Sequence, residues 1–255
     1  MRLLRAAAPL LLAPLLLAQA EPLLVPDVSQ REVRIIYSFT GAELLAFGAI
    51  VYPGGRIPGE RVDVAVVLKG PVQPIVLREK RKVAGIWMNA ESARFRSAPS
   101  YYAVASSRPL PELVDARTAA IYELGLGNLQ LSPGGGARPE EGRRMEAGLV
   151  DLMRRQGLYV EIPNGVEITG NVLYRARIPI PSRVPVGRYT AETFLIRDGR
   201  VLAGAVKEVR IEHAGFERYV ADAAERHSLA YGLLAVSLSL LFGWAASALF
   251  RRRMA

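Results

Sequence analysis

The chain has 255 residues, a formal net charge of +9 and no cysteine, which excludes disulfide bonds and lipoprotein attachment. Five of its 33 basic residues lie in the two terminal segments, whereas all 24 acidic residues lie between them. The central region is therefore close to neutral and lacks the concentrated basic composition of a nucleic-acid-binding domain. We expect no nucleic acid among its partners, and we expect the fold to be stabilised by apolar burial alone.

The first 20 residues have the pattern of a signal peptide. Arg2 and Arg5 precede a Leu- and Ala-rich stretch at 10–18, and residues 18–20 supply the small-x-small pattern for cleavage before Glu21. An uncleaved N-terminal anchor is the alternative interpretation.

Residues 21–108 are predicted to form a first β-sandwich domain. Short apolar runs recur at intervals near ten residues and are separated by turns rich in Gly and Pro. The expected strands lie at 31–39, 44–51, 62–68, 75–77, 83–89, 92–96 and 101–105. This spacing is typical of an antiparallel, Ig-like sandwich. We expect Trp87 to pack in its core.

Residues 109–157 are predicted to form a helical connector, and residues 158–214 a second β-rich domain. The clearest helix is expected at 139–156, because acidic residues lie in its first turn, basic residues in its last turn and Gly157 follows it. Strands are expected at 158–162, 166–168, 172–180, 188–197 and 202–212, with a hairpin turn at 197–200. Whether the two strand-rich parts are separate domains is left open by the sequence.

The C-terminal segments predict a membrane anchor. Residues 215–228 are expected to form a juxtamembrane helix, and 229–250 run for 22 residues without a charge, which is long enough to cross a bilayer as a helix. The tail, 251–255, begins with three arginines and is therefore expected in the cytoplasm. The prediction is a single-pass protein of the inner membrane with its N-terminal region in the periplasm. Small residues in the span, including Gly232, Gly243 and Ala246, could allow another helix to pack closely.

No motif in the sequence predicts a catalytic or metal site. The only histidines are His213 and His227, and neither lies in a recognised signature. We therefore expect no enzymatic activity, no metal and no cofactor. The strongest polar feature is a charge run at 78–82. Arg78, Lys80 and Arg81, together with Arg94, could bind an anion; alternatively, the run is a solvated hairpin or protects a strand edge.

Several segments resemble the putative transmembrane protein family of alphaproteobacteria. The similarity is carried by 39–50 (FTGAELLAFGAI), 69–71 (KGP), 82–89 (KVAGIWMN), 97–106 (SAPSYYAVAS), 157–159 (GLY), 185–189 (PVGRY), 215–218 (GFER) and 250–252 (FRR). The resemblance implies a single-pass envelope protein and an accessory role beside a polytopic permease of the sulfite exporter type. It supplies no catalytic residues.

Two hypotheses from different classes follow from the sequence. The first is a membrane-anchored periplasmic binding or scaffolding module that partners a permease. The second is a periplasmic sensor or binding protein for a small anion, which would use the basic residues of the 78–94 region.

Overall fold

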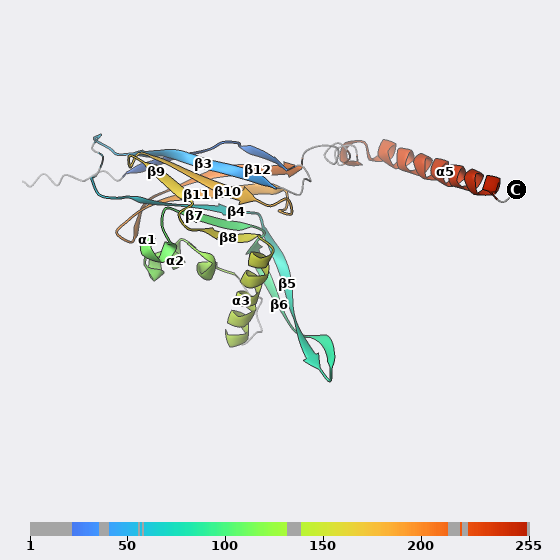
Figure 1. Cartoon of the computed structure of the whole chain (residues 1–255), viewed down its shortest axis with the longest axis horizontal. Helices are drawn as coiled ribbons and strands as arrows, with labels where there is room; N and C mark the ends of the chain where they lie inside the picture. The colour runs from blue at the N-terminus through green and yellow to red at the C-terminus, as the bar shows by residue number, and fades with distance from the viewer. Residues whose placement is uncertain are drawn as a thin grey trace, which may run out of the picture.

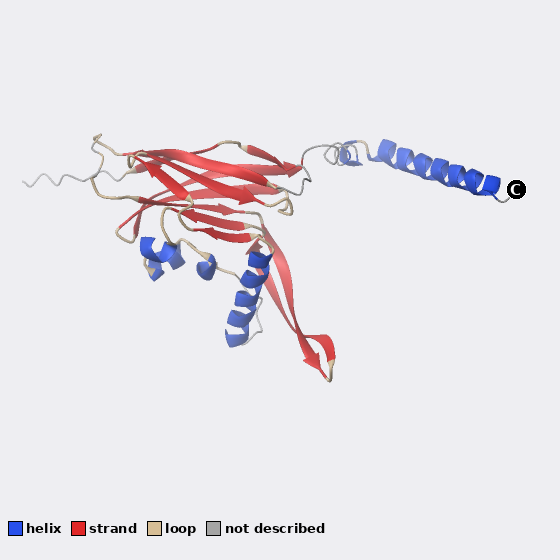
Figure 2. Ribbon diagram, viewed as in Figure 1, coloured by secondary structure: helices blue, strands red, loops and turns tan. Residues whose placement is uncertain are grey.

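The computed structural model describes residues 22–35, 41–55, 57, 59–131, 139–213, 220 and 224–253, and its architecture is mainly β (Figures 1 and 2). The predicted signal peptide and most of the predicted juxtamembrane helix lie outside the described residues. Two large sheets face each other, short helices cover one of them, and a two-stranded arm projects from the sandwich.

The first sheet has four strands, all antiparallel, in the order β1 (Leu23–Val28), β3 (Ala42–Val51), β10 (Leu173–Ile180) and β9 (Val166–Thr169). The second sheet has six strands in the order β2 (Glu32–Ile35), β12 (Arg200–His213), β11 (Gly187–Arg197), β4 (Asp63–Lys69), β7 (Tyr102–Ser106) and β8 (Tyr159–Ile162). Both edge strands of this sheet, β2 and β8, pair in parallel with their neighbours. The expectation of a purely antiparallel sandwich is therefore correct for the first sheet only.

Both sheets combine strands from before and after the helical connector. In the first sheet β3 pairs with β10, and in the second β4 pairs with β11 and β7 with β8. The boundaries predicted at 108 and 158 therefore do not divide the sheets. Residues of both strand-rich parts are buried in one core.

The main core lies between the two sheets. Alternate residues of β3, including Leu44 and Ile50, are buried with Val64, Val66 and Leu68 of β4. The intervening residues of β4 are buried as well, because helices cover the other side of the second sheet. A strand covered on both faces reads as a continuous apolar run, which is what the sequence of β4 shows.

The helical connector contains α1 (Leu110–Leu113), α2 (Ala116–Ile121), η1 (Leu126–Asn128) and α3 (Pro139–Arg155). The predicted helix at 139–156 is thus confirmed to within one residue. Gly157 follows it with φ 69°, the left-handed conformation that commonly ends a helix. A second core lies between the second sheet and the helices that cover it. There, Met145, Leu149 and Met153 of α3 are buried with residues of β4 and β7.

The arm is a long hairpin of β5 (Val72–Val83) and β6 (Ile86–Pro99) that forms its own two-stranded sheet. Its turn is Ala84-Gly85, with φ values of 50° and 86°, the positive pair that a type I′ turn requires. The strand predicted at 83–89 is therefore wrong, because the chain reverses inside it. At the foot of the arm, Ser100 N donates a hydrogen bond to Pro71 O at 2.9 Å, which joins the two ends of the hairpin where they enter the sandwich.

The last element is α5 (Ser228–Arg253), which lies apart from the sheets in Figure 1. By length and mean hydropathy, no helix in the described part of the chain qualifies as a membrane-crossing segment.

Candidate functional site

The predicted anion-binding residues Arg78, Lys80, Arg81 and Arg94 all lie on the arm, and three of them share one of its faces. Side chains of a strand alternate between its two faces, so the register of the hairpin separates Arg81 from the others. Arg81 lies on the face toward α3. Arg78, Lys80 and Arg94 lie on the opposite face.

The face toward α3 is packed and neutralised. Ile75 and Leu77 are half-buried against the second core, and their β6 neighbour Phe95 is fully buried. Further along the arm, Arg81 forms an ion pair with Glu91 at 3.0 Å. Arg144 of α3 joins the same cluster by pairing with Glu79 at 3.4 Å and with Glu91. Arg81 is therefore engaged in ion pairs within the chain.

The opposite face of the arm carries exposed cations, which we call the cationic strip. Its members are Arg78, Lys80 and Lys82 on β5 and Arg94 and Arg96 on β6. None of them forms an ion pair with another residue that the structure describes. The only two acidic residues of the arm, Glu79 and Glu91, lie on the other face. Lys82 belongs to the charge run at 78–82 but is not among the predicted anion-binding residues, and Arg96 lies outside the run, although the alternate spacing of both with 78, 80 and 94 is visible in the sequence.

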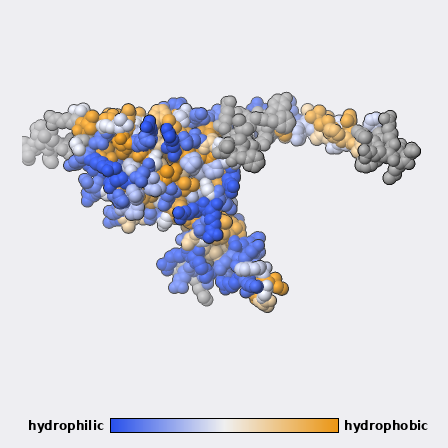
Figure 3. Space-filling model, viewed as in Figure 1, coloured by the Kyte–Doolittle hydropathy of each residue, from blue (hydrophilic) through white to orange (hydrophobic). Residues whose placement is uncertain are grey.

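The end of the arm is apolar and exposed. Val83, Ile86, Trp87 and Met88 form this apolar tip, and Ile86 and Trp87 have exposed fractions of 71% and 67%. Figure 3 shows a hydrophobic end beyond the hydrophilic stretch of the arm. The expectation that Trp87 packs in the sandwich core is wrong, because Trp87 lies beside the turn of the hairpin and is largely exposed. Figure 1 shows that the end of the arm projects past the sandwich and past α3.

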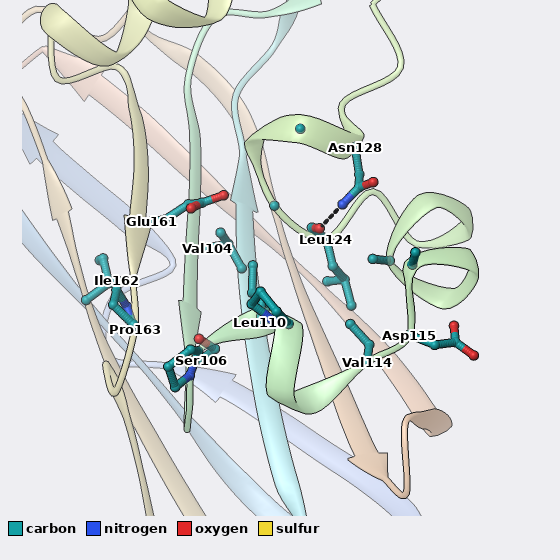
Figure 4. A pocket seen from close by; sticks show the side chains of 16 residues that line it. Val104, Ser106, Leu110, Val114, Asp115, Leu124, Asn128, Glu161, Ile162 and Pro163 are labelled. Atoms are coloured by element: carbon teal, nitrogen blue, oxygen red, sulfur yellow. Dashed lines mark hydrogen bonds between the residues drawn. The ribbon is translucent and has the colours of Figure 1, made fainter.

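A cavity of about 600 Å³ lies between the short helices and strands β7 and β8 (Figure 4). Its lining is largely apolar, and the polar side chains of Glu161, Asn128 and Asp115 are already hydrogen-bonded. Glu161 Oε1 accepts a hydrogen bond from Leu126 N at 2.6 Å, and Asn128 Nδ2 donates to Leu124 O at 2.7 Å. Asp115 caps α2 by accepting from Thr118 N. These bonds shape the loop around the cavity and leave few polar groups to orient a ligand.

A second, more polar cavity adjoins a buried carboxylate. Asp63 is 4% exposed, and its Oδ1 accepts hydrogen bonds from Ser107 Oγ at 2.7 Å and Arg108 Nε at 3.1 Å. Arg108 Nη2 also donates to Oδ2. Burial raises the pKa of Asp63, but the bonds from Arg108 and Ser107 outweigh it, so the net pKa lies below its ordinary value. This arrangement is a stabilising ion pair at the end of β4.

The remaining predicted site residues lie on α5. Gly232, Gly243 and Ala246 are exposed, and a side chain added at either glycine would meet open space in the described structure. Among the described residues, no group of three His, Cys, Asp or Glu side chains is placed to hold a metal ion.

The protein is thus a mixed β-sandwich with a projecting cationic arm and a separate C-terminal apolar helix. The chain belongs to the family described as "Putative transmembrane protein (Alph_Pro_TM)", whose model matches residues 23–252. The resemblance seen in the sequence is thereby confirmed.

Two further comparisons add little to the family assignment. No curated protein gives a significant match. Among solved structures, the chain is similar to the crystal structure of Spo0M, a sporulation control protein from Bacillus subtilis, with a TM-score of 0.30 and 9% sequence identity. That alignment covers 81% of this chain and 55% of the other, so the chain spans little more than half of that protein.

Proposed function

We propose that the protein is a non-enzymatic binding or scaffolding module, anchored in the inner membrane by residues 229–250, with its β-sandwich in the periplasm and a polytopic permease as partner. The arginines at 251–253 stay on the cytoplasmic side in this arrangement, as the positive-inside rule requires.

The proposal is carried by the exposed apolar side chains of α5 together with the family match, and not by the length and mean hydropathy of the helix. Its apolar residues are distributed around the whole helix, and its large side chains are exposed, among them Leu233, Leu240, Phe242 and Trp244. A helix that is apolar on all sides is stable only where something apolar surrounds it. Membership of a family described as transmembrane, over a match that extends through residue 252, points to lipid as that surrounding.

The alternative proposal, a binding protein for a small anion, has less support from the geometry. Small-molecule sites are concave and converge a few polar groups on the ligand. Arg78, Lys80 and Arg94 lie on an open strand face and line neither of the two cavities described above. We therefore favour the anchored module.

The orientation is tested by reporter fusions. A reporter that is active only outside the cytoplasm is expected to be active when fused after Glu212 and silent when fused after Ala255. The two fusions serve as controls for each other, because they differ only in whether the apolar segment precedes the reporter. Activity of the C-terminal fusion would overturn the proposed orientation.

Partnership with a permease is tested on the small residues of α5. Close packing of helices in lipid depends on small side chains that let the backbones approach. Gly243→Leu is therefore expected to reduce recovery of a co-purifying permease, while insertion is unchanged because leucine is favourable in the bilayer core. Leu240→Ile is the matched control. Equal recovery of the permease with wild type, Gly243→Leu and Leu240→Ile would show that the helix only anchors the chain.

A further inference from the structure

We infer that the arm is a second membrane contact, in which the cationic strip binds the anionic phospholipid headgroups of the same bilayer and the apolar tip enters its interface. The inference rests on the proposed anchoring, because it assigns a surface partner to a module already held at the membrane.

The charge of the cationic strip favours an anionic partner. Arg78, Lys80, Lys82, Arg94 and Arg96 share the face of the arm that points away from α3, and the acids of the arm are paired on the other face. A row of unpaired cations over two strands has no role in holding the hairpin together, since like charges on neighbouring strands repel. It complements a flat, negatively charged surface. Each Lys or Arg near an anionic lipid surface raises the binding constant by about 5-fold.

The exposed apolar tip supports a membrane contact independently of the charge. Val83, Ile86, Trp87 and Met88 surround the turn and have no cover in the described structure. A contiguous exposed apolar patch is typical of an interaction site. Trp is enriched at the membrane interface, where its ring lies at headgroup level. Trp87 is opposite Lys82 in the hairpin register, which places an aromatic ring beside a cation whose apolar stem can follow it into the interface.

The position and the length of the arm allow its tip to reach the bilayer. The arm leaves the sandwich at the end from which the chain continues toward α5. Pro71 at its foot packs against Gly187, and the β12 partner of Gly187 is Ile211, close to the end of that strand at His213. Figure 1 shows the foot of the arm at the same end of the sheets as the exit toward α5. At roughly 3.3 Å per residue, a 14-residue strand extends about 45 Å, so the tip can reach a bilayer that lies at that end.

The test uses the full chain carrying Trp244→Phe, which leaves Trp87 as the only tryptophan. The protein is reconstituted into vesicles of phosphatidylcholine alone or of phosphatidylcholine with phosphatidylglycerol. With the anionic lipid, Trp87 emission is expected to shift to the blue and to be quenched by brominated lipid. With phosphatidylcholine alone, Trp87 is expected to remain accessible to aqueous iodide.

The charge requirement is tested by the triple variant Arg78→Gln, Lys80→Gln, Lys82→Gln. Removal of three cations is expected to lower the ratio of docked to free arm by about 100-fold, which abolishes the lipid-dependent shift. The matched control Arg117→Gln, Arg143→Gln, Arg154→Gln removes the same charge from exposed positions of α2 and α3 and is expected to behave as wild type.

The outcomes separate this inference from the proposed function. Flotation of the chain with phosphatidylcholine vesicles reports anchoring alone. If the chain floats with both vesicle types but Trp87 responds to neither, or responds equally in the triple variant, the contact of the cationic strip with anionic lipid is overturned. If the chain floats only with the anionic vesicles and does so through the strip, the lipid contact stands and the anchor is overturned.

Discussion

Truncation of Phe95 to alanine is expected to lower the free energy of unfolding by about 3–5 kcal/mol, the range for removing a fully buried aromatic side chain. Phe95 is 0% exposed and belongs to the second core with Met145 and Leu149 of α3. It therefore fixes the foot of the arm to the sandwich, and its loss leaves a cavity at that junction. Denaturant unfolding of the detergent-solubilised full chain measures the change.

Trp87 provides the internal control, because it is an aromatic residue on the same strand. Trp87→Ala is expected to change stability by less than about 0.5 kcal/mol, since its side chain is largely exposed. A loss of several kcal/mol in Trp87→Ala would mean that the tip is packed within the chain. Equal, small effects of both substitutions would contradict the role assigned to Phe95.

The second large effect is expected at the buried ion pair. Arg108→Ala leaves the carboxylate of Asp63 buried with Ser107 and the more distant Arg61, whose Nε lies 3.7 Å away. Removing one partner of a fully buried pair costs about 3–5 kcal/mol, and the cost here is expected to be lower because the Arg108 side chain is 32% exposed. Arg177→Ala is the control, because the exposed pair of Arg177 with Glu43 at 3.9 Å contributes about 0–1 kcal/mol.

The same pair predicts a pH dependence whose sign follows from the lowered pKa of Asp63. The folded state holds this carboxyl ionised more strongly than the unfolded state, so its contribution is fully present above about pH 4 and is lost as the pH falls through the lowered pKa. The difference in stability between wild type and Arg108→Ala should therefore be largest near pH 7 and narrow in acid. A difference that is constant with pH would show that Asp63 is not the group responsible.

Elements that are determined by residues close together in the sequence are predicted correctly. The helix at 139–156 was recognised from its charged first and last turns, and the hairpin turn at 197–200 from Asp198-Gly199. These two residues have φ values of 50° and 78°, as a type I′ turn requires. The turn at Ala84-Gly85 has the same geometry, but alanine rarely adopts positive φ, so the sequence there resembled a continuous strand.

Long-range pairing could not be derived from the sequence. The parallel pairs β2–β12 and β7–β8 join segments far apart in the chain, and nothing within either segment specifies its partner. Trp87 illustrates the same limit. Its strand has the composition of a buried strand, and only the projection of the arm beyond α3 determines that the side chain is exposed.

The charge run at 78–82 is visible in the sequence, and the structure places it on one strand of a hairpin. Arg81 lies on the face opposite to Arg78, Lys80 and Arg94, because a one-residue step along a strand reverses the direction of the side chain. The ion pairs of Arg81 with Glu79 and Glu91 follow from that reversal and from the approach of α3.

Alkaline carbonate extraction tests the central proposal of a membrane anchor most directly. The full chain is compared with a chain that ends at His227, and carbonate also removes proteins held at the surface by charge alone. The full chain is expected to stay in the membrane fraction after extraction, and the truncated chain to be released with the soluble proteins. Release of the full chain, or retention of the truncated one, would contradict anchoring by residues 229–250.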